Sequence, residues 1–469
     1  MAALIVLGAA LVYANAFQGL FHLDDAAILR DPRISSVTDY VAHLPGMIRP
    51  ALRFSFLVDR AVWGENPSGY HLLNVLFHIG SVFFFYLIAR HLAGGDPGPS
   101  RRASREIVPV WAALLFLVHP IATETVTYVS GRATGMMAFF YLAGLYCYLR
   151  ATAATRPSEA RVASWPYAAA IACFALSLLS KEIAITFPLA LLLVEFVARR
   201  RRGSQFRQAV WRFHLPFWGV LAGFLCAAAL TPRYVYLLSV SRHIRPISEN
   251  LIAQVHAVAY ALTLFVLPGR LSIEHNFAPA GSLFVWPAFG SLLLIAALVA
   301  VAVACVRKHP IVAFGLFWFL LQLLPTNSVL ARYDLLSERN LYLAAPGLFF
   351  AIASSWSACI AWVMESMPRP AARVSQASAY VLPFVLVPLL AMATVDRNAV
   401  YASPVRFWAD AVRKAPSKAR PHVNLGYAYY LAGDFDKAIS EFRRALAIDR
   451  DDPVAQANLL AVWKLKETE

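Results

Sequence analysis

Long apolar segments recur along this chain, and they constrain its fold more than any other feature. A helix needs about 17 to 25 predominantly apolar residues to cross a bilayer, because its backbone polar groups must be satisfied within the segment. Such segments recur from Met1 to about Thr394 in a chain of 469 residues. The residues after Asp396 instead have the mixed charge of a water-soluble domain. The sequence therefore predicts an all-α polytopic membrane bundle followed by a small soluble domain.

The apolar pattern divides the chain into two predicted domains. Residues 1–395 form a membrane domain of about 11 to 13 helices with a long loop at 21–68, and residues 396–469 form the soluble domain. Twelve helices are predicted, at residues 2–20, 69–92, 107–120, 132–150, 165–180, 182–198, 213–231, 250–267, 283–305, 310–325, 340–364 and 377–394. Hydrophobic residues make up 59% of the chain and charged residues 15%, which excludes a disordered protein and an ordinary soluble enzyme.

The basic residues indicate how the bundle is oriented. The chain has 42 basic and 27 acidic residues, a formal net charge of +15. In a soluble protein this excess would suggest a nucleic-acid partner, but here the arginines cluster in short loops, as at 101–105 and 199–202. Cytoplasmic loops of membrane proteins have this bias. We therefore expect no nucleic-acid partner, a cytoplasmic N-terminus and an external loop at 21–68.

The second half of the bundle presents a parity problem. Three apolar segments separate the arginines at 199–202 from Arg307 and Lys308, which also look cytoplasmic, although an odd number of crossings cannot join two loops on one side. One segment must be broken, re-entrant or on the surface, and 250–267, which carries polar residues, is our candidate. This choice places the C-terminus outside. The alternative keeps all twelve crossings and a cytoplasmic C-terminus.

Residues 419–452 fit one tetratricopeptide unit, a helical hairpin of about 34 residues. The small residue Gly426 lets two antiparallel helices approach, and Phe442 fills the seam between them. One unit cannot bury its faces alone, so we expect a preceding helix at 404–416 and a closing helix at 453–466. Two roles are open for this array: a structural cap on the membrane domain, or a concave surface that binds peptides.

Two adjacent acids, Asp24 and Asp25, directly follow the first predicted helix. Neighbouring carboxylates beside a low-dielectric membrane repel each other, which raises the proton affinity of one of them and suits a general base. The alternative is that one of the two only caps a short helix at 25–30. The pair is therefore a candidate catalytic site on the external side.

Basic residues at the ends of apolar segments are candidates for binding an anion. Arg132 follows Ser130 and Gly131 at the start of a helix whose free amides would favour a phosphate, unless Arg132 merely extends to water. Lys181 and Glu182 lie between two apolar runs without room for a loop, so both sit near membrane depth. They form either a structural ion pair or part of a site. An anionic, lipid-borne substrate would suit such a site.

Other polar residues lie near the same predicted face. Glu338, Arg339 and Tyr342 open the eleventh predicted helix, and His119 and Glu124 lie between the third and the fourth. The polar residues in and after loop 21–68 that could line a cavity or satisfy one another are Arg49, Arg53, His71, Asn74 and His78.

Several chemistries have no support in the sequence. It contains no Walker motif, HExxH or GxSxG, so nucleotide-driven reactions and zinc or serine hydrolysis are not indicated. The five cysteines lie inside apolar segments without CxxC spacing, which predicts neither disulfides nor a zinc site. We therefore predict no metal ligands, while transport is not excluded.

Taken together, the motifs resemble a known family. They are similar to the transmembrane and tetratricopeptide-repeat-containing O-mannosyltransferase-like proteins of the GT-C glycosyltransferase superfamily. The resemblance covers nearly the whole chain and rests on these segments: Asp24–Asp25, Arg49–Pro50 to Trp63–Gly64, Gly69 to Asn74, His119–Pro120 with Glu124, Ser130–Gly131–Arg132, Lys181–Glu182, Leu324–Pro325 with Asn327, and Glu338 to Leu343. The chain departs from the family pattern in having few repeats and in Arg339–Asn340, where an Arg-Tyr pair is commoner.

The resemblance implies a GT-C-like fold and an inverting transfer of a sugar from a polyprenyl-phosphate donor on the external face. Asp24 would deprotonate or orient the acceptor hydroxyl, and Asp25 would support that acidic site. The other implied roles are these: Arg132, Lys181 and Arg339 stabilise the leaving phosphate, Glu124, Glu182 and Glu338 hold those cations, and His119 and Tyr342 line the pocket. The scheme requires no cofactor and no metal, although some relatives in the superfamily use a divalent metal.

More than one function is open from the sequence. The leading hypothesis is a bacterial inner-membrane enzyme that moves one mannose-like sugar from undecaprenyl phosphate to a protein Ser or Thr on the periplasmic face. Its repeats would help to bind the protein acceptor. The alternatives are transfer to a lipid or polysaccharide, a non-catalytic scaffold whose repeats recruit an envelope complex and, more remotely, a transporter.

Overall fold

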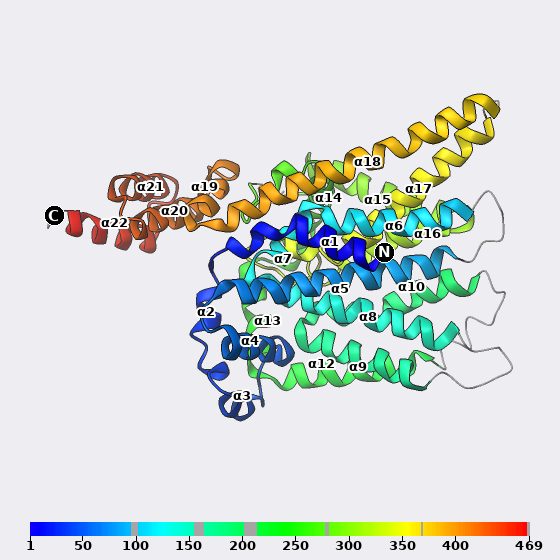
Figure 1. Cartoon of the computed structure of the whole chain (residues 1–469). Coiled ribbons are helices and arrows are strands. Elements are labelled where there is room, and N and C mark those ends of the chain that lie inside the picture. The colour runs from blue at the N-terminus through cyan, green and yellow to red at the C-terminus, as the bar shows by residue number, and fades with distance from the viewer. Residues whose placement is uncertain (95–101, 154–163, 201–212, 277–280, 367–368, 467–469) are drawn as a thin grey trace.

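Helices build the part of the chain that the structure describes. The structure is a computed structural model, and it describes residues 1–94, 102–153, 164–200, 213–276, 281–366 and 369–466. No strand occurs among these residues. Long helices lie side by side in a bundle, and a smaller helical domain projects from one end of it (Figure 1). The predicted all-α class is therefore confirmed.

Each of the twelve predicted segments corresponds to a helix of the bundle. These helices are α1 (Ala2–Val12), α5 (Pro67–Ala93), α6 (Arg102–Val118), α8 (Arg132–Ala153), α9 (Ser164–Ser180), α10 (Phe187–Arg200), α12 (Leu215–Leu230), α14 (Ile247–Val266), α15 (Ala288–Lys308), α16 (Pro310–Leu323), α17 (Ala345–Ser366) and α18 (Arg369–Ala399). By length and composition, 5 described helices could cross a membrane, or up to 7 if each of two bent pairs is one span. The chain is a multi-pass membrane protein.

Small residues set the distance between the packed helices α16 and α17. Gly315 and Gly347 face each other so closely that a Cβ atom on either one would collide with the backbone carbonyl oxygen of the other. Lipid tails are as apolar as leucine, so membrane helices associate through close backbone approach of this kind and not through a hydrophobic driving force. The two glycines therefore fix this contact inside the bundle.

The helices that the apolar pattern does not predict include α3 (Val37–His43) and α4 (Pro50–Trp63) in loop 21–68, and α13 (Pro232–Ile244). Helix α4 buries Leu52 and Phe56 and exposes Phe54 and Val58 on its other side. Such helices are too short and too polar to give a spanning signal. They lie across the end of the bundle from which the C-terminal domain projects (Figure 1).

The parity problem has a structural counterpart between residues 213 and 305. Helix α14 could span a membrane by length and composition, and each of its ends is bonded to another segment of the chain. The Asn250 side chain donates to the carbonyl of Ser328 at 2.6 Å, and His119 donates to the carbonyl of Phe265 at 3.0 Å. The chain also bends by 80° between α12 and α13. The bend lies between α12 and α13 and not in α14, so the re-entrant path of 250–267 stays a prediction.

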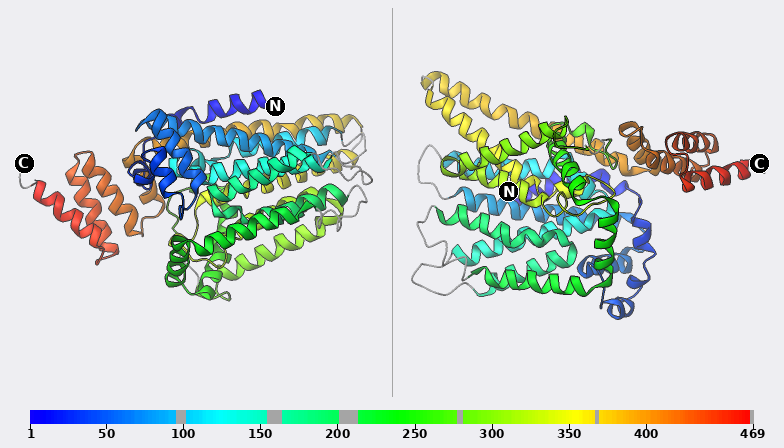
Figure 2. Two further views of the ribbon diagram at one scale, coloured as in Figure 1. Left: turned by 90° about the horizontal axis from the view of Figure 1, so that it is seen from below. Right: turned by 180° about the vertical axis from the view of Figure 1, so that it is seen from behind.

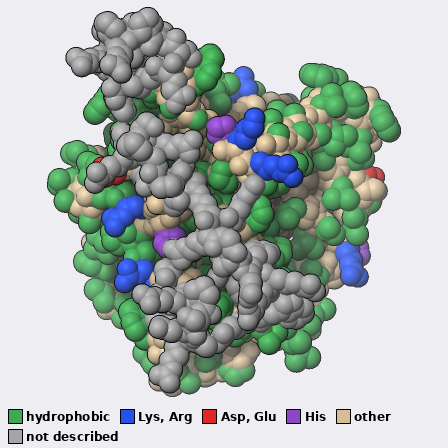
Figure 3. Space-filling model, turned by 90° about the vertical axis from the view of Figure 1, so that its right-hand side faces the viewer, with side chains coloured by type: hydrophobic (Ala, Val, Ile, Leu, Met, Phe, Trp, Pro, Cys, Tyr) green, Lys and Arg blue, Asp and Glu red, His purple; other side chains and the backbone are tan. Residues whose placement is uncertain are grey.

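The C-terminal domain consists of α19 (Pro404–Lys414), α20 (Ala419–Leu431), α21 (Phe435–Ile448) and α22 (Pro453–Lys466) (Figure 2). Helix α18 continues through the predicted domain boundary to Ala399. The domain is joined to the loop after α14, because Lys414 Nζ donates to the carbonyl of Leu271 at 2.5 Å and Lys418 pairs with Glu274 at 3.2 Å. The domain and loop 21–68 therefore share one end of the bundle. At the opposite end, Lys and Arg side chains lie around the loops drawn in grey (Figure 3).

Candidate active site

Asp25 is a buried carboxylate that ties two loops together. It opens the short helix α2 (Asp25–Leu29) and is 0% exposed. Its Oδ1 accepts hydrogen bonds from the Ser130 backbone N–H at 2.9 Å and from the Ser130 hydroxyl at 2.5 Å, and its Oδ2 accepts from the backbone N–H of His22 at 2.9 Å. Burial raises the pKa of Asp25 to about 7 even though these hydrogen bonds lower it. Because Asp25 is buried and bonded within the protein, its carboxylate is out of reach of a substrate.

Asp24 has the opposite environment. It occupies the position before α2 without making a side-chain cap hydrogen bond, and its side chain is exposed. Its backbone N–H donates to the hydroxyl of Tyr128 at 3.2 Å. The backbone of Asp24 is thus held in place, while its carboxylate remains open to a ligand.

Arg339 lies on the other side of Tyr128. Its guanidinium group sits 5.4 Å from the centre of the Tyr128 ring, and its Nε pairs with Glu124 Oε1 at 2.7 Å. The Arg339 backbone N–H also donates to Glu124 Oε2 at 3.1 Å. Arg339 and Asp24 interact electrostatically. The predicted base and one predicted cation therefore flank a single tyrosine.

Lys181 is a nearly buried cation at the start of η6 (Glu182–Thr186). Its side chain is 7% exposed and donates to the Thr134 hydroxyl at 2.7 Å. Burial, and after it the positive charge of neighbouring arginines, holds the pKa of Lys181 well below its usual range. These arginines are Arg339, Arg49 and Arg332. Four cations from distant parts of the chain therefore converge here.

The converging cations outnumber the carboxylates that pair with them. Arg49 forms two hydrogen bonds with Glu182, at 2.9 and 2.6 Å, and Arg49 outweighs burial to lower the pKa of Glu182 to about 2. Within the part of the chain that the structure describes, no carboxylate forms an ion pair with Lys181 or Arg332. When Lys181 is protonated, the four cations and the two carboxylates that hold Arg49 and Arg339 leave an excess of two positive charges. An anion would compensate for this excess.

Arg132 occupies a different place from the one that the sequence suggested. It is 0% exposed, forms an ion pair with Asp59 and donates to Asn74 Oδ1 at 2.8 Å and to the carbonyl of Tyr70 at 2.9 Å. Its guanidinium group also lies 4.3 Å from the centre of the Phe56 ring. These contacts pack α4 and α5 against the start of α8, and they leave Arg132 no open side for a phosphate.

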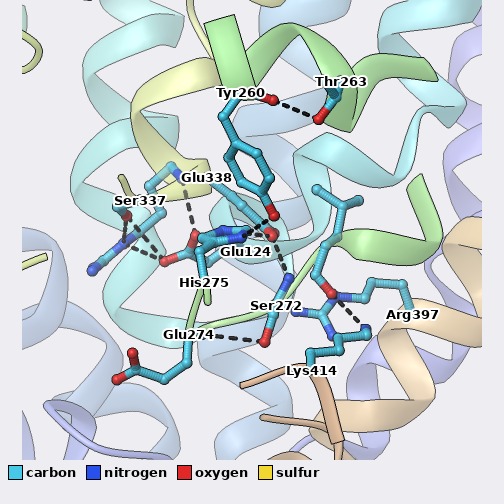
Figure 4. A network of polar contacts seen from close by, with 12 residues as sticks. Glu124, Tyr260, Thr263, Ser272, Glu274, His275, Ser337, Glu338, Arg397 and Lys414 are labelled. Atoms are coloured by element: carbon cyan, nitrogen blue, oxygen red, sulfur yellow. Dashed lines mark hydrogen bonds and ion pairs between the residues drawn. The ribbon is translucent and has the colours of Figure 1, made fainter. Parts of the chain in front are cut away.

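Of the three glutamates, only Glu124 holds a cation from the expected set of Arg132, Lys181 and Arg339. Glu182 holds Arg49 instead of Lys181, and Glu124 holds Arg339. Glu338 accepts from the Ser272 backbone N–H at 2.5 Å and lies 3.3 Å from His275 Nε2. Figure 4 shows Glu338 pointing toward His275 and Ser272. Each glutamate therefore holds a neighbouring group in place: Glu124 holds Arg339, Glu182 holds Arg49, and Glu338 holds the loop that carries Ser272 and His275.

His119 and Tyr342 lie inside the bundle. His119 Nδ1 accepts from the backbone N–H of Ile121 at 3.1 Å and the ring is 2% exposed. Tyr342 is fully buried and donates to His78 Nδ1 at 2.7 Å. Both side chains have structural partners, so they support the neighbouring helices and do not reach the cation cluster.

The sequence pattern indicated Arg49 only as a residue that could line a cavity, and it did not indicate Arg332 or Tyr128. Arg49 lies just before α4 in a left-handed conformation, with φ 54°, and this turn directs the chain back toward α9. Arg332 lies in the loop before η8 (Glu338–Leu341). Neither loop has a periodic pattern that could have indicated its position. In the described part of the chain, no three His, Cys, Asp or Glu side chains are grouped so that they could hold a metal ion.

The fold and the cation cluster define a class: a multi-pass helical membrane protein with a cluster of cations near an exposed carboxylate and one helical-repeat unit at the same end. The tetratricopeptide repeat model matches residues 419–452, which confirms the predicted unit. The chain is 33% identical to human protein O-mannosyl-transferase TMTC2 over 141 residues, which are 29% of this chain and 15% of the relative. The comparisons thus confirm the resemblance to the transmembrane and tetratricopeptide-repeat-containing O-mannosyltransferases.

Two longer matches cover most of the chain. Mouse protein O-mannosyl-transferase TMTC3 is 24% identical over 476 residues, 89% of this chain and 46% of the relative. A protein O-mannosyl-transferase of Caenorhabditis elegans is 23% identical over 383 residues, 81% of this chain and 50% of the relative. The chain thus spans at most half of the length of these curated relatives. Among solved structures, ArnT from Cupriavidus metallidurans bound to undecaprenyl phosphate has a TM-score of 0.46 at 14% identity, over 89% of this chain and 80% of that chain.

Proposed function

We propose that this protein is a glycosyltransferase that moves one mannose-like sugar from a polyprenyl-phosphate donor to a Ser or Thr hydroxyl of a protein. The observation that carries the proposal is the excess of positive charge around Lys181, next to the exposed carboxylate of Asp24. The names of the relatives support mannose as the sugar and protein as the acceptor. The reaction would take place at the end of the bundle that holds loop 21–68.

The cation cluster is suited to the phosphate of the donor. When the bond between the anomeric carbon and the phosphate oxygen breaks, the bonding electrons remain on the phosphate. Fixed cations in a place with little water stabilise this developing charge strongly. We assign this role to Lys181 and Arg339, as the sequence indicated, and add Arg49 and Arg332. Arg132 instead holds the helices that carry the site.

Asp24 would act as the general base. The acceptor hydroxyl forms a bond to the anomeric carbon from the side opposite the leaving phosphate, which inverts the configuration, and its proton passes to Asp24. Asp25 would fix the loop, since its oxygens are already bonded to Ser130 and His22. A phosphate that leaves as an anion needs no general acid.

The location follows from the same proposal. The arginine-rich loops would face the cytoplasm of a bacterial cell, so the site and the C-terminal domain would lie on the periplasmic side of the inner membrane. An undecaprenyl-phosphate sugar could then reach the cations from the outer leaflet. The repeat unit would bind the polypeptide that carries the acceptor hydroxyl.

The substitution Asp24→Asn tests the proposal directly. The purified protein, in lipid nanodiscs, is given radiolabelled mannosyl undecaprenyl phosphate and Ser- and Thr-containing peptides. We expect Asp24→Asn to lower transfer at least roughly a hundredfold, because general-base catalysis contributes about that much. Asp39→Asn changes a half-buried aspartate of the same loop, whose carboxylate accepts from the Ser36 hydroxyl, and should transfer sugar at the normal rate.

Other outcomes separate the alternatives. Label in a lipid or polysaccharide product, with none in peptide, would contradict the protein acceptor and keep the transferase. Equal rates for Asp24→Asn and the unchanged protein would contradict the role of the base. A wild-type protein that moves no sugar but still binds envelope proteins through its repeats would indicate the scaffold.

A further inference from the structure

The junction between the membrane bundle and the C-terminal domain lies beside two parts of the candidate site, the Asp24–Asp25 loop and the loop that carries Arg339. We infer that Arg397, at the end of α18, and Tyr401, in η9 (Val400–Ala402), are positioning residues that hold Arg339 and the Asp24–Asp25 loop in register. The C-terminal domain would then be a working part of the site as well as a surface for an acceptor. This inference rests on the proposed function.

One side of the junction holds the acidic loop. The carbonyl of Tyr401 accepts a hydrogen bond from His22 Nε2 at 2.8 Å, and the backbone N–H of the same His22 donates to Asp25 Oδ2 at 2.9 Å. The His22 ring also stacks on Phe407 of α19, with ring centres 4.7 Å apart. His22 is 5% exposed. Residue 401 and α19 therefore fix the segment that leads directly into Asp24.

The other side of the junction faces the loop of Arg339. Arg397 is 7% exposed, its Nη1 donates to Asp410 Oδ2 at 2.6 Å, and its charge also acts on Glu338. Glu338 is the neighbour of Arg339 in the sequence and is 0% exposed. The hydroxyl of Tyr401 lies in the same polar group, where it interacts electrostatically with Glu338 and Arg339.

A second connection reinforces the first. Lys414 of α19 donates to the carbonyl of Leu271, and the next backbone N–H, that of Ser272, donates to Glu338 Oε1. Figure 4 shows Arg397 and Lys414 on the side of Ser272 that faces the C-terminal domain, with Glu338 on the other side. The loop at 271–272 thus lies between α19 and the anchor of Arg339.

Charge balance gives Arg397 its role. Glu124 and Glu338 are two buried carboxylates that repel each other, and Arg339 is paired with Glu124. The second cation is Arg397: its partner Asp410 is also paired with Arg413 and Lys414, so positive charge remains at Arg397 to act on Glu338. Without it, both carboxylates would compete for Arg339, because an uncompensated buried charge is costly. Arg339 would then shift from its place beside the donor phosphate, and a displacement of about 1 Å is enough to weaken function strongly.

The test measures donor affinity and turnover separately, in full-length protein in nanodiscs. We expect Arg397→Gln to raise the Kd for undecaprenyl phosphate and the donor KM roughly tenfold to a hundredfold, as is usual for residues that orient a ligand-binding group. Arg397→Lys, which keeps the charge, should recover most of the affinity. Arg406→Gln removes an exposed arginine from α19 and should leave both values unchanged.

A second variant addresses the acidic loop. His22→Phe keeps a ring that can stack on Phe407 but removes the hydrogen bond to the carbonyl of Tyr401. We expect it to lower kcat with little change in donor Kd, the opposite split from Arg397→Gln. General loss of folding would change both parameters in both variants, so the split distinguishes positioning from simple stabilisation.

Two results would overturn the inference: an unchanged donor Kd in Arg397→Gln, or equal losses in Arg397→Gln and Arg397→Lys together with the same loss in His22→Phe. The binding measurement uses undecaprenyl phosphate alone. If the wild-type protein binds this lipid but transfers no mannose, the proposed function fails. The Kd of Arg397→Gln for the lipid still tests whether Arg397 positions the binding site.

Discussion

Asp24 and Asp25 are the same residue type at adjacent positions, yet they have opposite environments. Asp25 is 0% exposed and satisfied by three donors, while Asp24 is exposed. The sequence predicted a candidate catalytic site at this pair but not that only Asp25 would be buried. The burial of Asp25 depends on Ser130, which is 105 residues away along the chain. Tertiary contacts of this kind have no local signal.

The pH dependence of stability should report the burial of Asp25. Its pKa in the folded protein is about 7, above the ordinary 3.8, so the folded state binds a proton more tightly than the unfolded state does. Stability should therefore fall as pH rises from about 4 to about 7, by on the order of a few kcal/mol in total. We expect Asp25→Asn to remove this slope in thermal unfolding between pH 5 and pH 8, in detergent. Parallel slopes in both proteins would contradict the burial.

The buried charge of Lys181 should lower the stability of the ligand-free protein and raise its affinity for an anionic ligand. Its charge lies among three arginines without an acidic partner, so Lys181→Met should leave the thermal stability of the ligand-free protein unchanged or higher. The same change should raise the Kd for undecaprenyl phosphate roughly 10- to 100-fold, the usual cost of one charge-assisted hydrogen bond. Lys437→Met, at an exposed lysine of the C-terminal domain, is the control. Lower stability together with normal binding would make Lys181 a structural residue.

At the scale of helices, the sequence predicted those helices that long apolar segments or a repeat pattern indicate. All twelve long segments are helices, whereas α4 and α13 were missed because they lie across the end of the bundle and carry a mixed polar pattern. The tetratricopeptide unit was located correctly because its small and large residues recur at set spacings. The pairing of Arg132 with Asp59 could not be foreseen, because α4 itself was not predicted.

The contact between α16 and α17 yields a test at this scale. Gly315→Leu would place a side chain against the backbone of Gly347, where no space exists, so we expect a loss of about 1–3 kcal/mol of stability. Gly219→Leu is the matched control, since a Cβ at that helical glycine meets nothing within 4 Å. Thermal unfolding in detergent measures both. Equal effects of the two substitutions would show that this glycine contact is not tightly packed.

For the whole molecule, the central feature is that loop 21–68 and the C-terminal domain share one end of the bundle. In a cysteine-free background, Asp39→Cys and Lys437→Cys should both react with a membrane-impermeant maleimide in intact cells. Glu106→Cys, at the start of α6 and at the other end, should react only after the membrane is opened. Labelling of Lys437→Cys only together with Glu106→Cys would contradict the arrangement and favour twelve crossings.

The excess of two positive charges that the cluster carries when Lys181 is protonated has a kinetic consequence for the proposed reaction. A sugar-linked carrier is a phosphodiester with one negative charge, whereas the spent carrier is a monoester with roughly 1.5 to 2 at neutral pH. The cluster therefore matches the spent carrier better than the loaded one. Release of the spent lipid, and not bond breaking, would then set the turnover rate. Transfer would be faster in membranes that contain little free polyprenyl phosphate.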